Sequence, residues 1–163
     1  MALVVSGVLT GVGTALPWLT QVATLPAPQR HTQEVTYTFP GIEFGNGWFV
    51  IFAAALLVIV ALEAVVLRRR WIDWLVLLPV VIGGLSLGHW LAALNRGGSE
   101  FPIGVGVSLA GILVATPAVA MLHRGRVPAR LAIAAATLVA TGVALLLGAL
   151  LEMVAPISVY RTF

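Results

Sequence analysis

The sequence predicts an all-α integral membrane helix bundle of about five transmembrane helices, with a small β-hairpin in the first outer loop. Composition, five apolar runs and clustered arginines support this prediction. Hydrophobic residues make up 60% of the 163 residues and charged residues only 9%, and the mean hydropathy is +1.06. A soluble chain of this length has too little interior to bury so much apolar surface, so we expect one transmembrane domain over residues 1–163.

Five long apolar runs define the predicted helices. Each has roughly the ~20 residues that a helix needs to cross the hydrocarbon layer. None alternates regularly between apolar and polar residues, as a strand of a membrane barrel does. A helix satisfies its own backbone hydrogen bonds, so a single segment of this kind can lie in lipid. The runs are Ala2–Leu19, Trp48–Leu67, Trp74–Leu94, Ile103–Leu122 and Leu131–Val154.

The arginines between these runs predict the orientation. Two connections carry six arginines: Arg68, Arg69, Arg70, Arg124, Arg126 and Arg130. The opposite side carries three: Arg30, Arg96 and Arg161. By the positive-inside rule the two clustered connections face the cytoplasm, so we expect a cell-membrane protein with a cytoplasmic N-terminus and an extracytoplasmic C-terminus. The same rule accounts for the basic pI without a nucleic-acid partner.

The first outer loop, Thr20–Gly47, is the one substantial segment outside the apolar runs. Val35–Phe39 alternates apolar and polar residues, which is typical of a strand. Pro40-Gly41 is a turn signal, and Ile42–Phe44 can pair back as the second strand. A two-stranded hairpin is marginal on its own in water, so it should pack on the bundle or on a partner. The docking residues we expect are Tyr37, Phe39 and Phe44.

Small residues at four-residue spacing indicate close helix packing. The spacing occurs in three runs, at Gly7/Gly11, at Gly84/Gly88 and at Ala136/Ala140/Ala144/Gly148. Small side chains let two helices in a membrane approach closely. Each four-residue step drifts by ~40° around a helix, so such a row meets a straight partner over only a few steps. The contact is either packing within this chain or association with another subunit.

His89 and Glu152 form a candidate polar pair inside the membrane. His89 lies ~22 Å along the third run from Trp74, at about 1.5 Å per residue, and Glu152 lies near the outer end of the fifth run. The two therefore have similar depth, and the carboxylate can accept a hydrogen bond from the imidazole. An ionisable residue within a transmembrane segment is a functional candidate. The alternative is a structural hydrogen bond or a side chain that reaches the interface.

The sequence offers no pattern for a cofactor, a metal or catalysis. Haem ligation by two histidines needs equal depth, and neither His31 nor His123 matches His89. Divalent-cation ligand types occur on the outer face, in His31, Glu34 and Glu43 together with the pair, but their spacing matches no known pattern. Nucleotide, zinc-protease and serine-hydrolase motifs are missing, and the chain has no cysteine. We therefore expect a non-enzymatic protein.

Two segments carry a family resemblance. Leu16-Pro17-Trp18 is followed after the outer loop by Gly41-Ile42-Glu43-Phe44-Gly45-Asn46-Gly47-Trp48 and by an apolar helix that ends in Arg68-Arg69-Arg70. These first 70 or so residues resemble small multi-pass membrane proteins of GC-rich prokaryotes, most of which have no assigned activity. The hairpin-bearing outer loop is also similar to that of claudin-like four-helix proteins. This chain lacks their cysteine pair and has an extra helix, so their function does not carry over.

The sequence favours a protein that works by association. We expect an accessory or scaffolding subunit of a larger membrane complex, in contact with membrane lipid and with other membrane subunits or a second copy of itself. The alternative is a small oligomeric transporter or channel that uses His89 and Glu152 at an outer gate. Stoichiometric partner proteins in a mild-detergent preparation would favour the first hypothesis, and a lone homo-oligomer the second.

Overall fold

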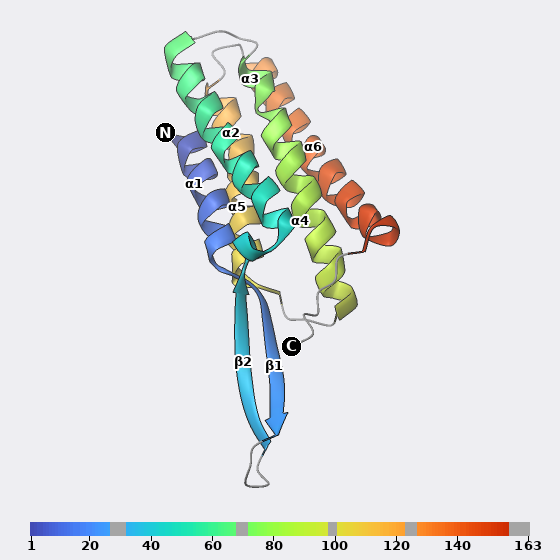
Figure 1. Ribbon diagram of the computed structural model, residues 1–163. Coiled ribbons are helices and arrows are strands. Elements are labelled where there is room, and N and C mark those ends of the chain that lie inside the picture. The colour runs from blue at the N-terminus through green and yellow to red at the C-terminus, as the bar shows by residue number, and fades with distance from the viewer. Residues whose placement is uncertain (27–31, 68–71, 98–100, 123–126, 157–163) are drawn as a thin grey trace.

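The computed structural model is a helix bundle from one end of which a β-hairpin projects (Figure 1). It describes residues 1–26, 32–67, 72–97, 101–122 and 127–156. In chain order the elements are α1 (Ala2–Ala15), β1 (Pro17–Pro26), β2 (Thr32–Pro40), a 3-10 turn η1 (Gly41–Glu43), α2 (Gly45–Leu67), α3 (Ile72–Leu75), α4 (Leu77–Gly97), α5 (Ile103–Leu122) and α6 (Val127–Val154).

Four helices, α2, α4, α5 and α6, are long and apolar enough to cross a membrane, which supports a multi-pass membrane protein. The first helix is shorter than predicted. With 14 residues α1 is about 21 Å long, against a hydrocarbon layer of about 30 Å. It ends at Ala15 because Leu16 is already extended, with φ −84° and ψ 162°. A residue before proline disfavours the helical region, and Pro17 follows.

The third predicted run begins with a break. α3 ends at Leu75, and α4 starts at Leu77. Pro79 explains the interruption, because proline has no N–H to donate to the carbonyl of Leu75 four residues earlier. The next regular bond runs from Val80 N to Val76 O, at 3.3 Å.

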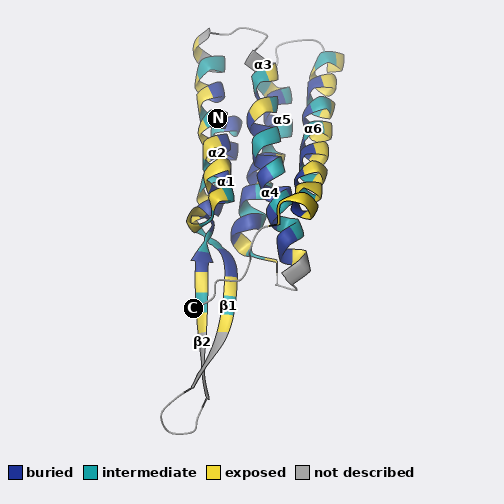
Figure 2. Cartoon of the chain, turned by 45° about the vertical axis from the view of Figure 1, so that its right-hand side comes forward, coloured by how far each residue is buried: buried dark blue, intermediate teal, exposed yellow. Residues whose placement is uncertain are grey.

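The five longest helices pack as a closed ring. α1 contacts α2 and α5, α4 contacts α2 and α6, and α5 contacts α6. The outward surfaces of α2 and α6 remain largely exposed in the chain (Figure 2). Their exposed side chains are large and apolar, including Phe52, Leu62, Leu138 and Leu146. A surface of this kind suits lipid rather than water.

α4 and α6 approach backbone to backbone through the small residues that the sequence indicated. A Cβ built on Gly88 would meet the carbonyl of Leu145, and one built on Gly148 would meet the carbonyl of Leu85. On Gly84 it would lie 2.8 Å from Ala144 Cβ. These small residues therefore pack within the chain.

The rest of the predicted small residues have different positions. A Cβ on Gly7 would lie 2.8 Å from Val58 Cγ2, so this glycine admits α2, whereas Gly11 makes ordinary contact with Ala54. Ala136 and Ala140 are only half-buried. In that half of α6 the buried positions are Ile133, Thr137 and Thr141, and the buried stripe then passes to Ala144, Gly148 and Glu152. Residues spaced four apart shift gradually around the helix, so one such row is buried in the first half of α6 and another in the second half.

Hydrogen bonds between helices join α1 to α5. Ser6 Oγ donates to Gly111 O at 2.6 Å, and Ser108 Oγ donates to Thr10 O at 3.0 Å. Both serines are fully buried. In lipid, bonds of this kind and close packing hold helices together, because burying apolar surface gives little gain there.

We predict opposite effects for two glycine-to-alanine changes on α6. Gly148→Ala should lower the free energy of unfolding in detergent by about 1–3 kcal/mol, because its methyl group meets the α4 backbone. Gly142→Ala meets nothing within 4 Å and should be neutral or stabilising by up to about 1 kcal/mol through helix propensity. Thermal unfolding of both variants measures the difference. Equal stabilisation by the two changes would contradict the close approach of α4 and α6.

Candidate functional site

The hairpin differs in extent and register from the prediction. β1 and β2 pair antiparallel, with Pro17 opposite Pro40, Leu19 opposite Phe39 and Pro26 opposite Thr32. The turn therefore lies between Pro26 and Thr32, and the predicted turn at Pro40-Gly41 is wrong. Ile42–Phe44 does not pair back, because Gly41–Glu43 forms the 3-10 turn that leads into α2. The strand missed from the sequence is β1.

An aromatic cluster joins the base of the hairpin to the helices. Trp18 and Trp90 are fully buried, with ring centroids 5.6 Å apart. Phe44 packs on Trp90 at 4.4 Å and on Phe39 at 6.5 Å. Trp18 Nε1 donates to Gly13 O at 2.9 Å, at the end of α1. Phe39 and Phe44 thus serve to hold the hairpin on the bundle, and Tyr37, half-buried on the same face of β2, lies farther out.

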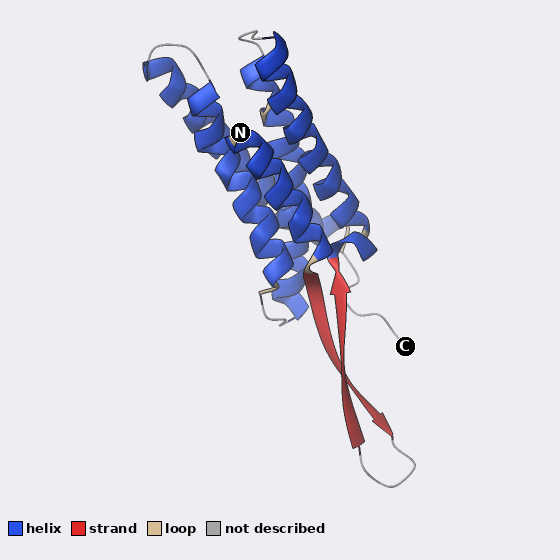
Figure 3. Cartoon of the chain, turned by 90° about the vertical axis from the view of Figure 1, so that its left-hand side faces the viewer, coloured by secondary structure: helices blue, strands red, loops and turns tan. Residues whose placement is uncertain are grey.

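The opposite face of the hairpin is exposed. Beyond its base the hairpin extends away from the helices (Figure 3). Successive strand residues point to opposite faces, and the positions that alternate with Leu19, Phe39 and Tyr37 are exposed: Thr20, Val22, Thr36 and Thr38. Val22 is 62% exposed. We call these four residues the outer hairpin face. The alternation in β2 indicated two faces, but this face could not be assigned from the sequence because β1 was not predicted.

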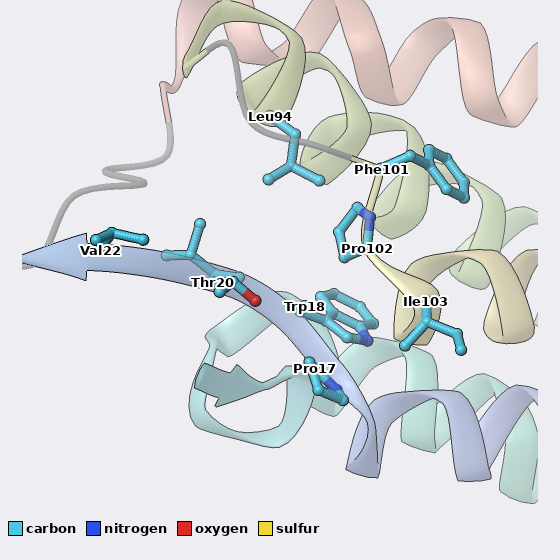
Figure 4. A pocket seen from close by; sticks show the side chains of 9 residues that line it. Pro17, Trp18, Thr20, Val22, Leu94, Phe101, Pro102 and Ile103 are labelled. Carbon is cyan, nitrogen blue, oxygen red and sulfur yellow. The ribbon is translucent and has the colours of Figure 1, made fainter. Parts of the chain in front are cut away.

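A pocket of about 550 Å³ lies beside the outer hairpin face. It is bounded by β1, the C-terminal end of α4 and the N-terminal end of α5. Trp18, Thr20 and Val22 line it from β1. Leu94, Phe101 and Pro102 lie across from them (Figure 4). The lining side chains are apolar except for Thr20. The pocket can therefore accept an apolar side chain from a segment that lies along the hairpin.

The structure brings His89 and Glu152 together at the hairpin end of α4 and α6. His89 Nε2 lies 2.7 Å from Glu152 Oε2 and 2.7 Å from the backbone oxygen of Ala155. Glu152 is 2% exposed and the His89 side chain 16%. The close approach at Gly148 sets this geometry, because a Cβ there would lie 2.8 Å from His89 N. Glu152 follows one helical turn later.

The two oxygen atoms beside His89 Nε2 indicate that this nitrogen is a hydrogen-bond donor. A backbone carbonyl can only accept, so His89 Nε2 carries a hydrogen and donates. The same N–H faces the Glu152 carboxylate, which accepts. The carboxylate and the C-terminal carbonyls of α6 both place negative charge at this nitrogen. The pair therefore ties the end of α6 to α4.

The other expected site residues do not form a metal centre in the described part of the chain. No group of three or more His, Asp or Glu side chains there could hold a metal ion. His31 lies outside the described residues. No family model matches the sequence, and comparisons with curated proteins and with solved structures found no match.

We predict that His89 and Glu152 are energetically coupled. Glu152→Leu should lower the free energy of unfolding by about 1.5–3 kcal/mol, because it removes the charge-assisted hydrogen bond and leaves the His89 N–H with the Ala155 carbonyl alone. Glu152→Gln should cost less, since the amide oxygen still accepts. Thermal unfolding in detergent of Glu152→Leu, His89→Leu and the double variant measures the coupling. Losses that simply add would contradict it.

Proposed function

We propose that this chain is a non-enzymatic subunit that works by association in a membrane complex. The observation that carries the proposal is the outer hairpin face with the pocket at its base. Two strands alone are marginally stable in water, and the distal hairpin has no helix beneath it (Figures 1 and 3). A partner segment on this surface would supply the missing support.

The chemistry of the surface indicates the kind of partner. β1 pairs with β2 on one edge, and no strand pairs with its other edge among the described residues. An extended segment can add to such an edge through backbone hydrogen bonds. An apolar side chain of the same segment would fill the pocket next to Val22, as a central anchor does in protein interfaces. The partner we propose is therefore an extracytoplasmic loop or terminus of another membrane subunit.

The proposed orientation follows from the arginine clusters and places the hairpin outside the cytoplasm. The N-terminus is then cytoplasmic and the C-terminus extracytoplasmic. In the structure α6 ends on the same side as the base of the hairpin (Figure 1). This arrangement leaves the hairpin accessible to extracytoplasmic domains. We place the chain in the cell membrane.

The channel or transporter hypothesis would use His89 and Glu152 at an outer gate. It needs a polar route past this pair. Among the described residues, α4 and α6 meet backbone to backbone at Gly88 and Gly148, directly beside the pair. That packing favours a structural role for the pair over a gate, so association remains our proposal.

Shortening the hairpin should separate association from folding. Replacing residues 23–35 with Asn-Gly joins Val22 to Thr36, which face each other in the sheet, through a two-residue turn that suits a hairpin. The aromatic base remains intact, so the melting temperature in detergent should not change. Stoichiometric co-purification of the partner from native membranes in mild detergent should be lost. Retention of the partner, or a full-length chain that purifies alone, would contradict the proposal.

A charge on the outer hairpin face should weaken the same complex. Val22→Glu should reduce the recovered partner at least about tenfold, because partner binding would bury a carboxylate beside the apolar side chains that line the pocket. Ile42→Glu is the matched control, since Ile42 is exposed but lies outside this face. Quantitative mass spectrometry of the purified complexes measures both. Equal losses for the two variants would exclude Val22 from the contact.

The orientation predicts opposite reporter signals at two positions. A periplasmic reporter such as alkaline phosphatase should be active when fused at Phe163 and inactive when fused after Arg70. The fusion after Arg70 retains Arg68, Arg69 and Arg70, which hold that connection in the cytoplasm. Activity at both positions, or the reverse pattern, would refute the proposed orientation.

A further inference from the structure

A second pocket opens on the lateral surface of the bundle, toward its hairpin end, between α2, α4 and α6. Its volume is about 300 Å³, at the lower end of the range for small-molecule sites. α2, α4 and α6 line it with four apolar side chains, Phe49, Ile82, Leu85 and Leu151, and three polar residues, Asn46, Ser86 and His89. Phe49 and Leu151 are 60% and 45% exposed, so the mouth of the pocket lies in the apolar outer surface.

The polar residues of this pocket leave one donor unused. Ser86 Oγ donates its hydrogen to Asn46 O at 2.7 Å. His89 Nε2 faces Glu152 and Ala155. Asn46 Nδ2 is buried and has no hydrogen-bond partner among the described residues. A buried donor without a partner costs free energy, and in a native protein it calls for an acceptor.

The position of Asn46 lets it serve a ligand. It is the second residue of α2, so it lies at the hairpin end of the bundle, where the polar ends of membrane molecules meet the protein. Asn46 lines the pocket, and because the amide torsion of asparagine is broad, a bound acceptor could draw Nδ2 toward the pocket. An acceptor that enters from the apolar mouth would then meet this donor, with its apolar part against Phe49, Ile82 and Leu151.

From this arrangement we infer that the lateral pocket binds a membrane-soluble molecule that presents a carbonyl oxygen on an apolar body. The carbonyl accepts from Asn46 Nδ2, and the apolar body fills the space between α2, α4 and α6. Two kinds of membrane molecule have this chemistry, a prenylated quinone through its ring carbonyl and a phospholipid through its ester carbonyl. The inference is independent of the hairpin surface, because the two sites share no residue.

The test uses one variant that removes the donor and keeps the fold. Asn46→Asp replaces the amide nitrogen with an oxygen that only accepts and repels a carbonyl. A carboxylate in the first turn of α2 is favourable to the helix dipole, so the variant should fold. Asn95→Asp is the matched control, because Asn95 is exposed near the end of α4 and does not line the pocket. Unliganded melting temperatures check that both variants fold.

Two probes distinguish the sources of the carbonyl. A naphthoquinone with a short isoprenoid chain is titrated against the detergent-solubilised full chain, and native mass spectrometry measures retained dioleoyl phosphatidylglycerol. Wild type and Asn95→Asp should bind one equivalent of one probe, and Asn46→Asp should bind it at least about tenfold more weakly. Loss confined to the quinone identifies a quinone site, and loss confined to the phospholipid identifies a lipid site.

A variant that fills the pocket gives an independent check. Ile82→Phe adds volume at the lining of the pocket and should block the same probe without changing the hydrogen-bonding groups. If neither probe binds the wild-type chain stoichiometrically, or if Asn46→Asp and Ile82→Phe both bind like the wild type, the inference is overturned. If Asn46 binds only water, neither probe will bind the wild-type chain stoichiometrically.

Discussion

Close approach of helix backbones at glycine positions sets the arrangement of the bundle. In lipid the burial of apolar side chains gives little net gain, so helices associate through close packing and hydrogen bonds between them. Gly88 and Gly148 bring α4 against α6, and a side chain at either position would meet backbone atoms. The same contact places Glu152 beside His89, one turn beyond Gly148. The His89–Glu152 pair is therefore a consequence of the packing. It links the end of α6 to α4 just beyond the last small residue of the row.

The hairpin end of the molecule is held by aromatic packing instead. Trp18 and Trp90 are fully buried between the hairpin and the helices, whereas Trp48 and Trp74 are more than half exposed, as residues at a membrane interface are. The buried tryptophans fix where the hairpin leaves the bundle. Leu19 and Phe39 pair on the face that packs inward, so Thr20, Val22, Thr36 and Thr38 face outward. The docking surface that we propose thus depends on two buried side chains, and one of them, Trp18, also lines the pocket at its base.

The helices could largely be predicted from the sequence, because a long apolar run in lipid has few alternatives to a helix. The prediction for Ile103–Leu122 matches α5 at both ends. The secondary-structure prediction was wrong where the same residue type is compatible with two different structures. Leu16 to Leu19 continues an apolar run, but Pro17 ends the helix and starts β1. Pro40-Gly41 has the composition of a turn, yet Pro40 pairs with Pro17 and the chain turns between Pro26 and Thr32. The pairing of His89 with Glu152 could be predicted because the two residues lie at similar depth along their helices. The lateral pocket could not, because Asn46, Ser86 and Leu151 come from three different helices and no single run predicts it.

The most direct test of association through the hairpin is photo-crosslinking in intact cells. A photoreactive amino acid at Val22 lies on the outer hairpin face, and one at Val143 lies on the exposed surface of α6. If the chain associates through the hairpin, Val22 should give one discrete protein adduct, whose mass identifies another subunit or a second copy of this chain, and Val143 should give no such adduct. The absence of a protein adduct at Val22, or the same adduct from both positions, would contradict association through the hairpin.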